Sequence, residues 1–335
     1  MSTGHEPVLG TDRRAALGRA GAPEPAHLVV TDGSPGQAPT PGRRGPARAL
    51  LAACRPRQWV KNLLVLAAPA AAGVLGTAGS LGRALAAFGL FVAASSGTYL
   101  LNDTVDAEAD RRHPAKRHRP IAAGELSPAA AVASAAVLLG LAVGLAPLVA
   151  GWRLAAIVGG YVVLTLAYSM RLKQVAFVEL ACLSLGFVLR AVGGAAATSV
   201  PVSPWFLVVT SAGALLLAAG KRSAELHLLG TAGGGHRRSL AAYPPWLLRA
   251  IRVVAAVVTV VGYVLWALWR GAHAHTVSFA FFAASTVPFA AAVAVLEGHL
   301  ARGEGGAPEE LALRSRTLQL LALACVAFVA TGVYT

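Results

Sequence analysis

Charged residues are scarce in this chain. Only 13% of its 335 residues are Asp, Glu, Lys or Arg, whereas 56% are hydrophobic and the mean hydropathy is +0.62. The apolar residues form separate runs of about 20 residues, which is the length needed to cross the hydrocarbon core of a bilayer. A soluble protein of this size buries a large core without so many runs of that length. The composition therefore argues against a soluble globular protein and predicts an all-α, polytopic membrane protein.

Cysteine is scarce as well. The three cysteines, Cys54, Cys182 and Cys325, are widely spaced, and no CxxC pair occurs. This spacing argues against a disulfide framework and against a zinc site, so we interpret all three as free thiols.

The N-terminal segment lacks the apolar h-region of a cleavable signal peptide. Residues 1–47 are instead rich in Gly, Pro, Ala and polar residues, a composition typical of disorder. We expect a disordered cytoplasmic tail at 1–47 and one transmembrane helical domain at 48–335.

About nine candidate spans follow the tail. Lys and Arg are concentrated in alternate connecting segments, and the poorer set contains only Arg83, Arg153 and Arg270. By the positive-inside rule we expect a plasma-membrane protein with its N-terminus in the cytoplasm and its C-terminus outside. The candidate spans are residues 58–76, 81–101, 128–149, 152–170, 174–196, 204–220, 248–269, 276–296 and 313–334.

The net charge of +14 does not indicate a nucleic-acid partner. The Lys and Arg residues lie between apolar spans rather than in one basic domain. We therefore expect them to face anionic membrane lipid and phosphate. The sequence leaves the oligomeric state open, a homo-oligomer included.

The densest charged block is NDTVDAEADRRHPAKRHRP at residues 102–120. If the preceding helix continues through it, Asn102, Asp106 and Asp110 fall at i, i+4 and i+8, with Asp103 close to the same face. Carboxylates crowded on one face repel one another unless a cation lies among them. Hard oxygen ligands suit Mg²⁺, which commonly completes its coordination with water and substrate phosphates. The block therefore predicts a magnesium site that includes Asn102, Asp103, Asp106 and Asp110.

Basic residues follow these acids directly. Lys116 and Arg119, with their basic neighbours, are donors suited to phosphate oxygens. A solvated cytoplasmic loop that obeys the positive-inside rule accounts for the same residues. Both interpretations stay open for the basic residues, whereas acidic residues contribute little to topology and favour a functional site.

Further polar residues lie in four other cytoplasmic segments and are candidates for closing one polar chamber. Glu179 and Arg190 lie inside an apolar span, where an unpaired charge costs a few kcal/mol, so they should face the bundle interior. Lys221 and Glu225 lie at i and i+4, which fits either a plain helix-stabilising pair or a site role. The remaining candidates are Lys61, Tyr168, Lys173 and Arg222.

At these residues the sequence resembles the UbiA superfamily of intramembrane prenyltransferases. The pattern NDxxDxxxD at 102–110 matches the first aspartate-rich motif of that superfamily. The resemblance implies about nine helices around a central cavity open to lipid. The chain departs from the usual second motif, a DxxxD-like pair, because the corresponding stretch contains Glu179 alone.

Five separated stretches resemble one branch of that superfamily, the actinobacterial decaprenyl-phosphate phosphoribosyltransferases. They lie at residues 55–62, 116–124, 186–194 and 220–226, together with the stretch around Glu179. The resemblance implies Mg²⁺-dependent transfer of 5-phosphoribose from phosphoribosyl pyrophosphate to decaprenyl phosphate. It also implies a catalytic role for Asp103, Asp106 and Asp110, and a product used to make the arabinose donor of cell-wall arabinan. The basic candidates would hold the phosphates, and Glu179 would contact ribose hydroxyls or brace a cation.

Two alternatives remain at this point. An aromatic polyprenyltransferase of quinone synthesis shares the first acidic motif but predicts a second metal cluster. A lipid transporter without enzymatic activity gives no reason for an acidic face beside a basic run.

Overall fold

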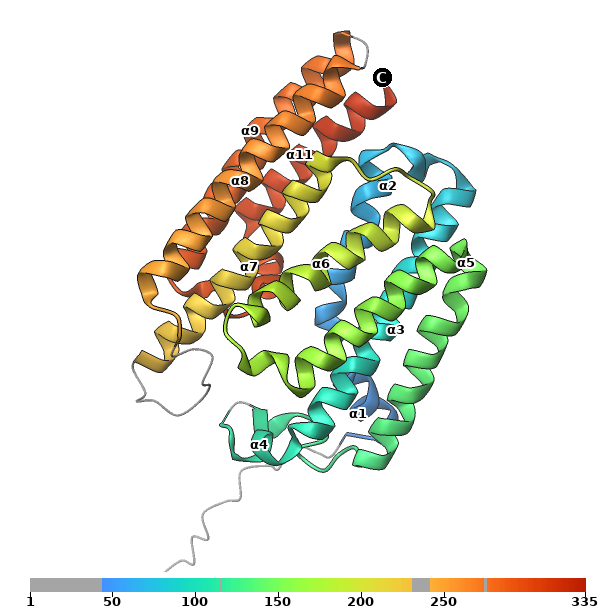
Figure 1. Ribbon diagram of the computed structural model, residues 1–335, viewed down its shortest axis with the longest axis vertical. Helices are drawn as coiled ribbons and strands as arrows, with labels where there is room; N and C mark the ends of the chain where they lie inside the picture. The colour runs from blue at the N-terminus through green and yellow to red at the C-terminus, as the bar shows by residue number, and fades with distance from the viewer. Residues whose placement is uncertain (1–43, 115, 231–241, 274–275) are drawn as a thin grey trace, which may run out of the picture. The chain divides into compact units, whose positions relative to one another are not determined.

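The structure is a computed structural model that describes residues 44–114, 116–230, 242–273 and 276–335. In these ranges the chain is helical and contains no β-strand (Figure 1). Seven of the described helices are long and apolar enough to cross a membrane, which confirms the all-α polytopic class. They are α3 (Ala78–Val105), α5 (Pro128–Met170), α6 (Val178–Ala197), α7 (Pro204–Gly230), α8 (Pro245–Ala272), α9 (Thr276–Ala301) and α11 (Arg316–Tyr334). The tail predicted at 1–47 lies outside the described ranges except for residues 44–47 and stays a prediction.

Helix α5 contains two of the predicted spans. Its 43 residues as one straight helix would reach about 65 Å, roughly twice the thickness of the hydrocarbon core. Ala150 and Gly151 have non-helical backbone angles, and the φ of 71° at Gly151 belongs to a region that glycine enters readily. The two arms therefore run in opposite directions (Figure 1). They correspond to the predicted spans 128–149 and 152–170.

The first predicted span is not a regular helix. Residues 58–76 fall in a broken segment of η1 (Pro56–Leu66, a 3₁₀ helix), α2 (Ala67–Ala71) and η2 (Val74–Gly76). Pro69 lacks the N–H that a helix interior requires, and Gly73 turns the chain with a φ of 75°. The predicted span at 58–76 is therefore a broken segment rather than one regular helix, and the seven described helices of membrane length, with α5 folded into two arms, do not confirm the expected count of nine.

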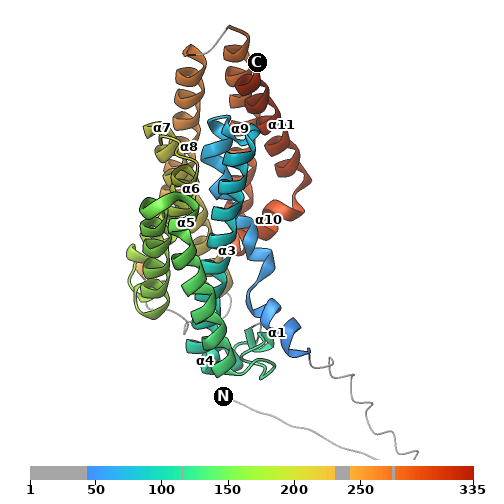
Figure 2. The same cartoon turned by 90° about the vertical axis from the view of Figure 1, so that its right-hand side faces the viewer.

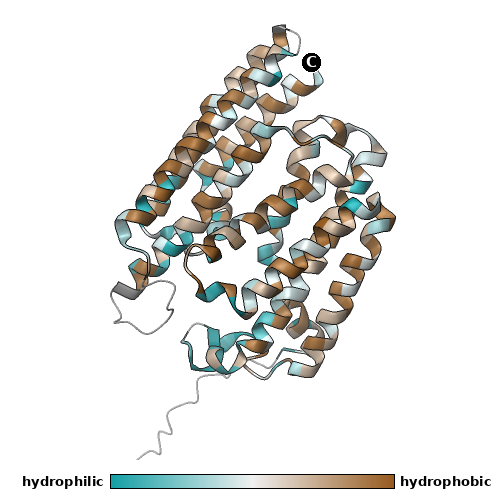
Figure 3. Ribbon diagram, in the orientation of Figure 1, coloured by the Kyte–Doolittle hydropathy of each residue, from teal (hydrophilic) through white to brown (hydrophobic). Residues whose placement is uncertain are grey.

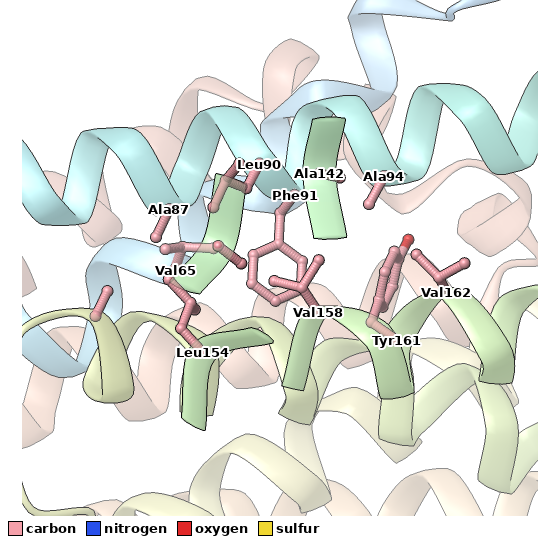
Figure 4. Close-up of a cluster of buried hydrophobic side chains, with 12 residues drawn as sticks. Val65, Ala87, Leu90, Phe91, Ala94, Ala142, Leu154, Val158, Tyr161 and Val162 are labelled. Carbon is pink, nitrogen blue, oxygen red and sulfur yellow. The ribbon is translucent and has the colours of Figure 1, made fainter. Parts of the chain in front are cut away.

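Two adjacent glycines of α6 allow close packing, Gly194 against the broken segment and Gly193 against α3. A Cβ on Gly194 would lie 1.7 Å from the carbonyl oxygen of Val65, and one on Gly193 would lie 2.4 Å from the ring of Phe91. Phe91 contacts Tyr161 edge to face, with ring centroids 5.4 Å apart, in a cluster of buried apolar side chains (Figure 4). The contact at Gly194 places η1 against α6, where Asn62 accepts a hydrogen bond from Arg190.

The charged block lies at one end of the long helices. Helix α3 ends at Val105 and the short α4 (Ala107–Arg112) follows, then η3 (Lys116–His118). Hydrophilic residues concentrate at α4 and its neighbouring segments, whereas the long helices are mainly hydrophobic (Figure 3). Helix α1 (Pro46–Ala53) and α10 (Pro308–Arg314) are short, and α10 lies beside η1 (Figure 2).

The three cysteines are free, as expected from their spacing. Burial raises the pKa of the Cys54 thiol, which disfavours the reactive thiolate at neutral pH.

Candidate active site

A cavity of about 460 Å³ lies among four helical elements: α3, the second arm of α5, α6 and α7. Residues of η1, η3, the connection at 306–308 and η4 (Leu172–Gln174) also line it. Ten of the candidate residues from the sequence line this cavity: Lys61, Asn102, Asp106, Lys116, Arg119, Tyr168, Lys173, Arg190, Lys221 and Glu225. The fold thus brings together residues that are spread over more than 160 positions of the chain.

Asp106 is the aspartate of the charged block that faces the cavity. The Nζ atom of Lys173 donates to both of its carboxylate oxygens at 2.9 Å. The two side chains retain 30% and 15% exposure, so each is accessible from the cavity. Lys173 comes from η4, at the end of α5, where the chain returns to the charged block.

Asp103 and Asp110 lie behind the cavity wall, and both are buried. Nη1 of Arg119 lies 3.0 Å from Asp103 Oδ1 and 2.7 Å from Asp110 Oδ2. Nη2 of Arg55 donates to Asp103 Oδ1 at 2.5 Å. Arg55 has a left-handed φ of 55°, a conformation that costs a non-glycine residue about 1–3 kcal/mol and often marks a functional site. The buried carboxylates therefore hold two basic residues at the cavity surface.

The acidic residues do not share one continuous helix face. The i, i+4, i+8 spacing assumed an unbroken helix, but Asp106 has φ −87° and ψ 1° and separates α3 from α4. This break directs Asp106 toward Lys173 and leaves Asp110 with Arg119. Within the described ranges, no three His, Cys, Asp or Glu side chains are arranged to hold one metal ion.

The donor set at the cavity surface still fits Mg²⁺. Asn102 and Asp106 offer an amide and a carboxylate oxygen to the cavity. The Lys173 ammonium, which lies against both oxygens of Asp106, shows that this carboxylate accepts a cationic partner. Mg²⁺ is usually bound through one or two carboxylates, with water and substrate phosphates completing its octahedron. A full cage of protein ligands is therefore not required.

Arg190 is a buried cation at the inner part of the cavity. It lies within α6 and is 6% exposed. Its donors reach Asn62 Oδ1 at 2.7 Å, the Gly186 carbonyl at 2.8 Å and the Tyr161 hydroxyl at 2.7 Å. All three partners are uncharged, and among the described residues no carboxylate pairs with it. A guanidinium has five N–H donors, so an anion in the cavity can neutralise the charge of Arg190 and accept its remaining hydrogen bonds.

Glu179 and Arg222 do not line the cavity. Both are fully buried, and Nη1 of Arg222 lies 3.5 Å from Glu179 Oε2 and 2.5 Å from Glu225 Oε2. Successive residues of an α-helix point about 100° apart, so Lys221 faces the cavity while Arg222 points into the packing between α6 and α7. Of the two roles considered for Glu179, this geometry favours bracing a cation.

Several lining residues were missed by the sequence analysis. They include Gln58, Tyr99 and Tyr161, as well as residues 306–308. Asn62, which orients Arg190, offered a signal, since it is an amide within an apolar stretch. Tyr161 offered none, because a tyrosine in a transmembrane span is usually a packing residue.

A protein-family model described as the UbiA prenyltransferase family matches residues 63–296. The chain is 40% identical over 314 residues to a protein of Corynebacterium glutamicum named decaprenyl-phosphate phosphoribosyltransferase, covering 93% of each chain. It is 42% identical over 289 residues to a protein of the same name from Mycobacterium tuberculosis, covering 84% of this chain and 93% of that protein.

Solved structures share the fold at low sequence identity. A UbiA homologue from Archaeoglobus fulgidus bound to GPP and Mg²⁺ has a TM-score of 0.59 and 16% identity, covering 86% of this chain and 100% of the other. A digeranylgeranylglyceryl phosphate synthase has a TM-score of 0.60 and 16% identity, covering 86% of this chain and 99% of the other.

Proposed function

The chain belongs to the UbiA prenyltransferase family, and from this premise we propose that it is a decaprenyl-phosphate phosphoribosyltransferase. It transfers 5-phosphoribose from phosphoribosyl pyrophosphate to decaprenyl phosphate and releases pyrophosphate. The product, decaprenylphosphoryl-5-phosphoribose, is a precursor of the arabinose donor for cell-wall arabinan. The relatives of that name span nearly the whole chain, which supports the assignment.

The observation that carries the proposal is the excess of positive charge in the cavity. Two carboxylates, Asp106 and Glu225, face it. The basic residues that line it are Arg55, Lys61, Lys116, Arg119, Lys173, Arg190 and Lys221. A prenyl diphosphate with an aromatic acceptor brings one phosphorylated end. The proposed substrates bring a pyrophosphate, a 5-phosphate and a lipid phosphate, and mutual repulsion among these anions must be offset by protein cations.

The proposed reaction is a displacement at ribose C1. A lipid phosphate oxygen forms a bond to C1 while the bond from C1 to pyrophosphate breaks, and the electron pair leaves with the pyrophosphate. A phosphate monoester with a second pKa of about 6 is largely dianionic at neutral pH. The attacking group therefore needs no general base, and the protein's task is to bind, orient and neutralise charge.

Asn102 and Asp106 are the residues that hold Mg²⁺ in this proposal, with Asp103 and Asp110 supporting the adjacent arginines. When bound, the ion offsets the charge that develops on the leaving pyrophosphate. Lys173 keeps the Asp106 carboxylate oriented toward the cavity. Arg190 and Lys221, at separate places on the wall, receive substrate phosphates.

We also propose that this cavity opens to the cytoplasm across the plasma membrane. The charged block at 102–120 supplies Asn102, Asp106, Lys116 and Arg119 to the cavity wall and lies at one end of the long helices (Figure 3). This arrangement agrees with the positive-inside rule and gives a soluble donor direct access.

The test is incubation of membranes containing the protein with labelled phosphoribosyl pyrophosphate and decaprenyl phosphate, followed by lipid extraction. We expect label in a lipid that retains the 5-phosphate. Asp106→Asn should remove this product, whereas Glu108→Gln is a matched control, since Glu108 is 70% exposed and pairs with Arg112 on α4. Prenylation of an aromatic acid from decaprenyl diphosphate, without labelled lipid, would replace the proposal with the quinone-type alternative.

A further inference from the structure

A second cavity, of about 360 Å³, lies at the other end of the helices. It is bounded by α2, the connection between α6 and α7, the start of α7 and the end of α8. None of its lining residues lines the first cavity, which contains Asp106 and Arg190 and is called the charged cavity. Its walls are mainly apolar and include Ala72, Phe206, Trp266 and Arg270.

Arg270 is the one cation among the described residues of this wall. Its guanidinium lies 5.8 Å from the ring centroid of Phe282, and within the described ranges it forms no ion pair or hydrogen bond. A cation in the last turn of a helix interacts favourably with the helix dipole, and Trp and Arg also anchor helices at a membrane interface. Those roles account for the residue types but not for the cavity beside them.

Trp152 and Arg153 show what anchoring alone looks like. They begin the second arm of α5, directly after the turn that lies at the same end of the helices as residues 266–270 (Figure 1). Trp152 is 74% exposed, and neither residue lines either of the two cavities. Trp266, by contrast, is 8% exposed and packs into a cluster with Tyr263 and Phe282. Trp266 and Arg270 therefore line a cavity, whereas Trp152 and Arg153 do not.

We propose that this cavity binds an anionic phospholipid of the leaflet opposite the charged cavity. The apolar wall formed by Ala72, Phe206 and Trp266 receives part of an acyl chain, since burying apolar surface drives such contacts. The Arg270 guanidinium binds the headgroup phosphate, for which its planar fork is suited. A hydrophilic anion gains nothing from the apolar wall, and in a zwitterionic phospholipid the headgroup's own ammonium already offsets the phosphate charge that the arginine would neutralise. An anionic amphiphile satisfies both.

The experiment uses the full chain, purified and delipidated in detergent, and titrated with phosphatidylglycerol or phosphatidylcholine. Bound lipid is counted by native mass spectrometry. We expect one phosphatidylglycerol per chain to be retained in preference to phosphatidylcholine. Arg270→Gln should weaken that binding at least tenfold, since it removes a charge-assisted contact. Arg153→Gln, the matched control, should leave it unchanged.

A second variant tests the cavity without altering its charge. Ala72→Leu fills part of the cavity and leaves Arg270 in place, and we expect it to reduce phosphatidylglycerol binding as well. Monodisperse elution and an unchanged melting temperature establish that each variant is folded. Equal weakening by Arg153→Gln and Arg270→Gln, or normal binding by both Arg270→Gln and Ala72→Leu, would show nonspecific annular lipid only and would overturn the proposal.

Discussion

Arg222→Met tests the division between a residue that binds substrate and one that holds the helices together. The guanidinium and the Glu179 carboxylate are both fully buried, and Arg222 also contacts Glu225. Removing one partner of a buried pair leaves an uncompensated charge and costs about 3–5 kcal/mol. With an unfolding entropy of about 2.1 cal/mol/K per residue, the 335-residue chain should lose roughly 4–7 °C of melting temperature. Thermal loss of monodisperse elution in detergent measures it.

Two further variants complete the test. Lys221→Met, on the same helix but facing the cavity, should change the melting temperature little. The double variant Glu179→Gln with Arg222→Met should recover much of the stability, since neither partner then leaves a buried charge. The reasoning is refuted if Arg222→Met melts like the unmodified protein and instead raises the KM for phosphoribosyl pyrophosphate, because Arg222 would then be a substrate ligand.

Three other predictions concern the proposed reaction and its orientation. Asp106→Asn and treatment with EDTA should each abolish transfer without unfolding the protein, because both remove metal from the site; near-normal turnover in the variant contradicts this assignment. Lys221→Ala should raise the KM for phosphoribosyl pyrophosphate roughly ten- to hundredfold, the value of one charge-assisted hydrogen bond, and affect decaprenyl phosphate much less; an equal effect on both substrates argues against a donor role. A reporter active only in the cytoplasm should be inactive when fused after Thr335; activity there means that the topology is inverted.

The sequence predicted the class of fold and most of the charged residues of the cavity wall for identifiable reasons. Apolar runs of membrane length are typical of transmembrane helices and rare in soluble proteins, and a charge inside such a run must face the bundle interior. Arg190 meets that expectation, since it lies on α6 with its donors bonded to Asn62 and Tyr161. The charged block also lies at the cavity, through Asp106 and Arg119.

The remaining details depend on backbone breaks that spacing does not reveal. The one-face arrangement of Asp106 and Asp110 required a continuous helix, and the chain breaks between α3 and α4. Lys221 and Arg222 are both candidates for the polar chamber by sequence, but adjacent helical residues point in different directions and only Lys221 lines the cavity. The irregular segment at 56–76 carries the local signals Pro69 and Gly73, but its close contact with α6 at Gly194 is a tertiary effect that spacing does not reveal.

The contact between Gly194 and Val65 limits which mutations the active site tolerates. Even an alanine at position 194 would place its Cβ 1.7 Å from the Val65 carbonyl oxygen, so η1 would have to shift away from α6. Lys61 and Asn62 lie on η1 and would move with it. In a genetic screen, substitutions at Gly194 would therefore be scored as active-site lesions, although this residue has no side chain and does not line the cavity. Among spontaneous variants, a backbone contact of this kind is as intolerant of change as the charged residues it positions.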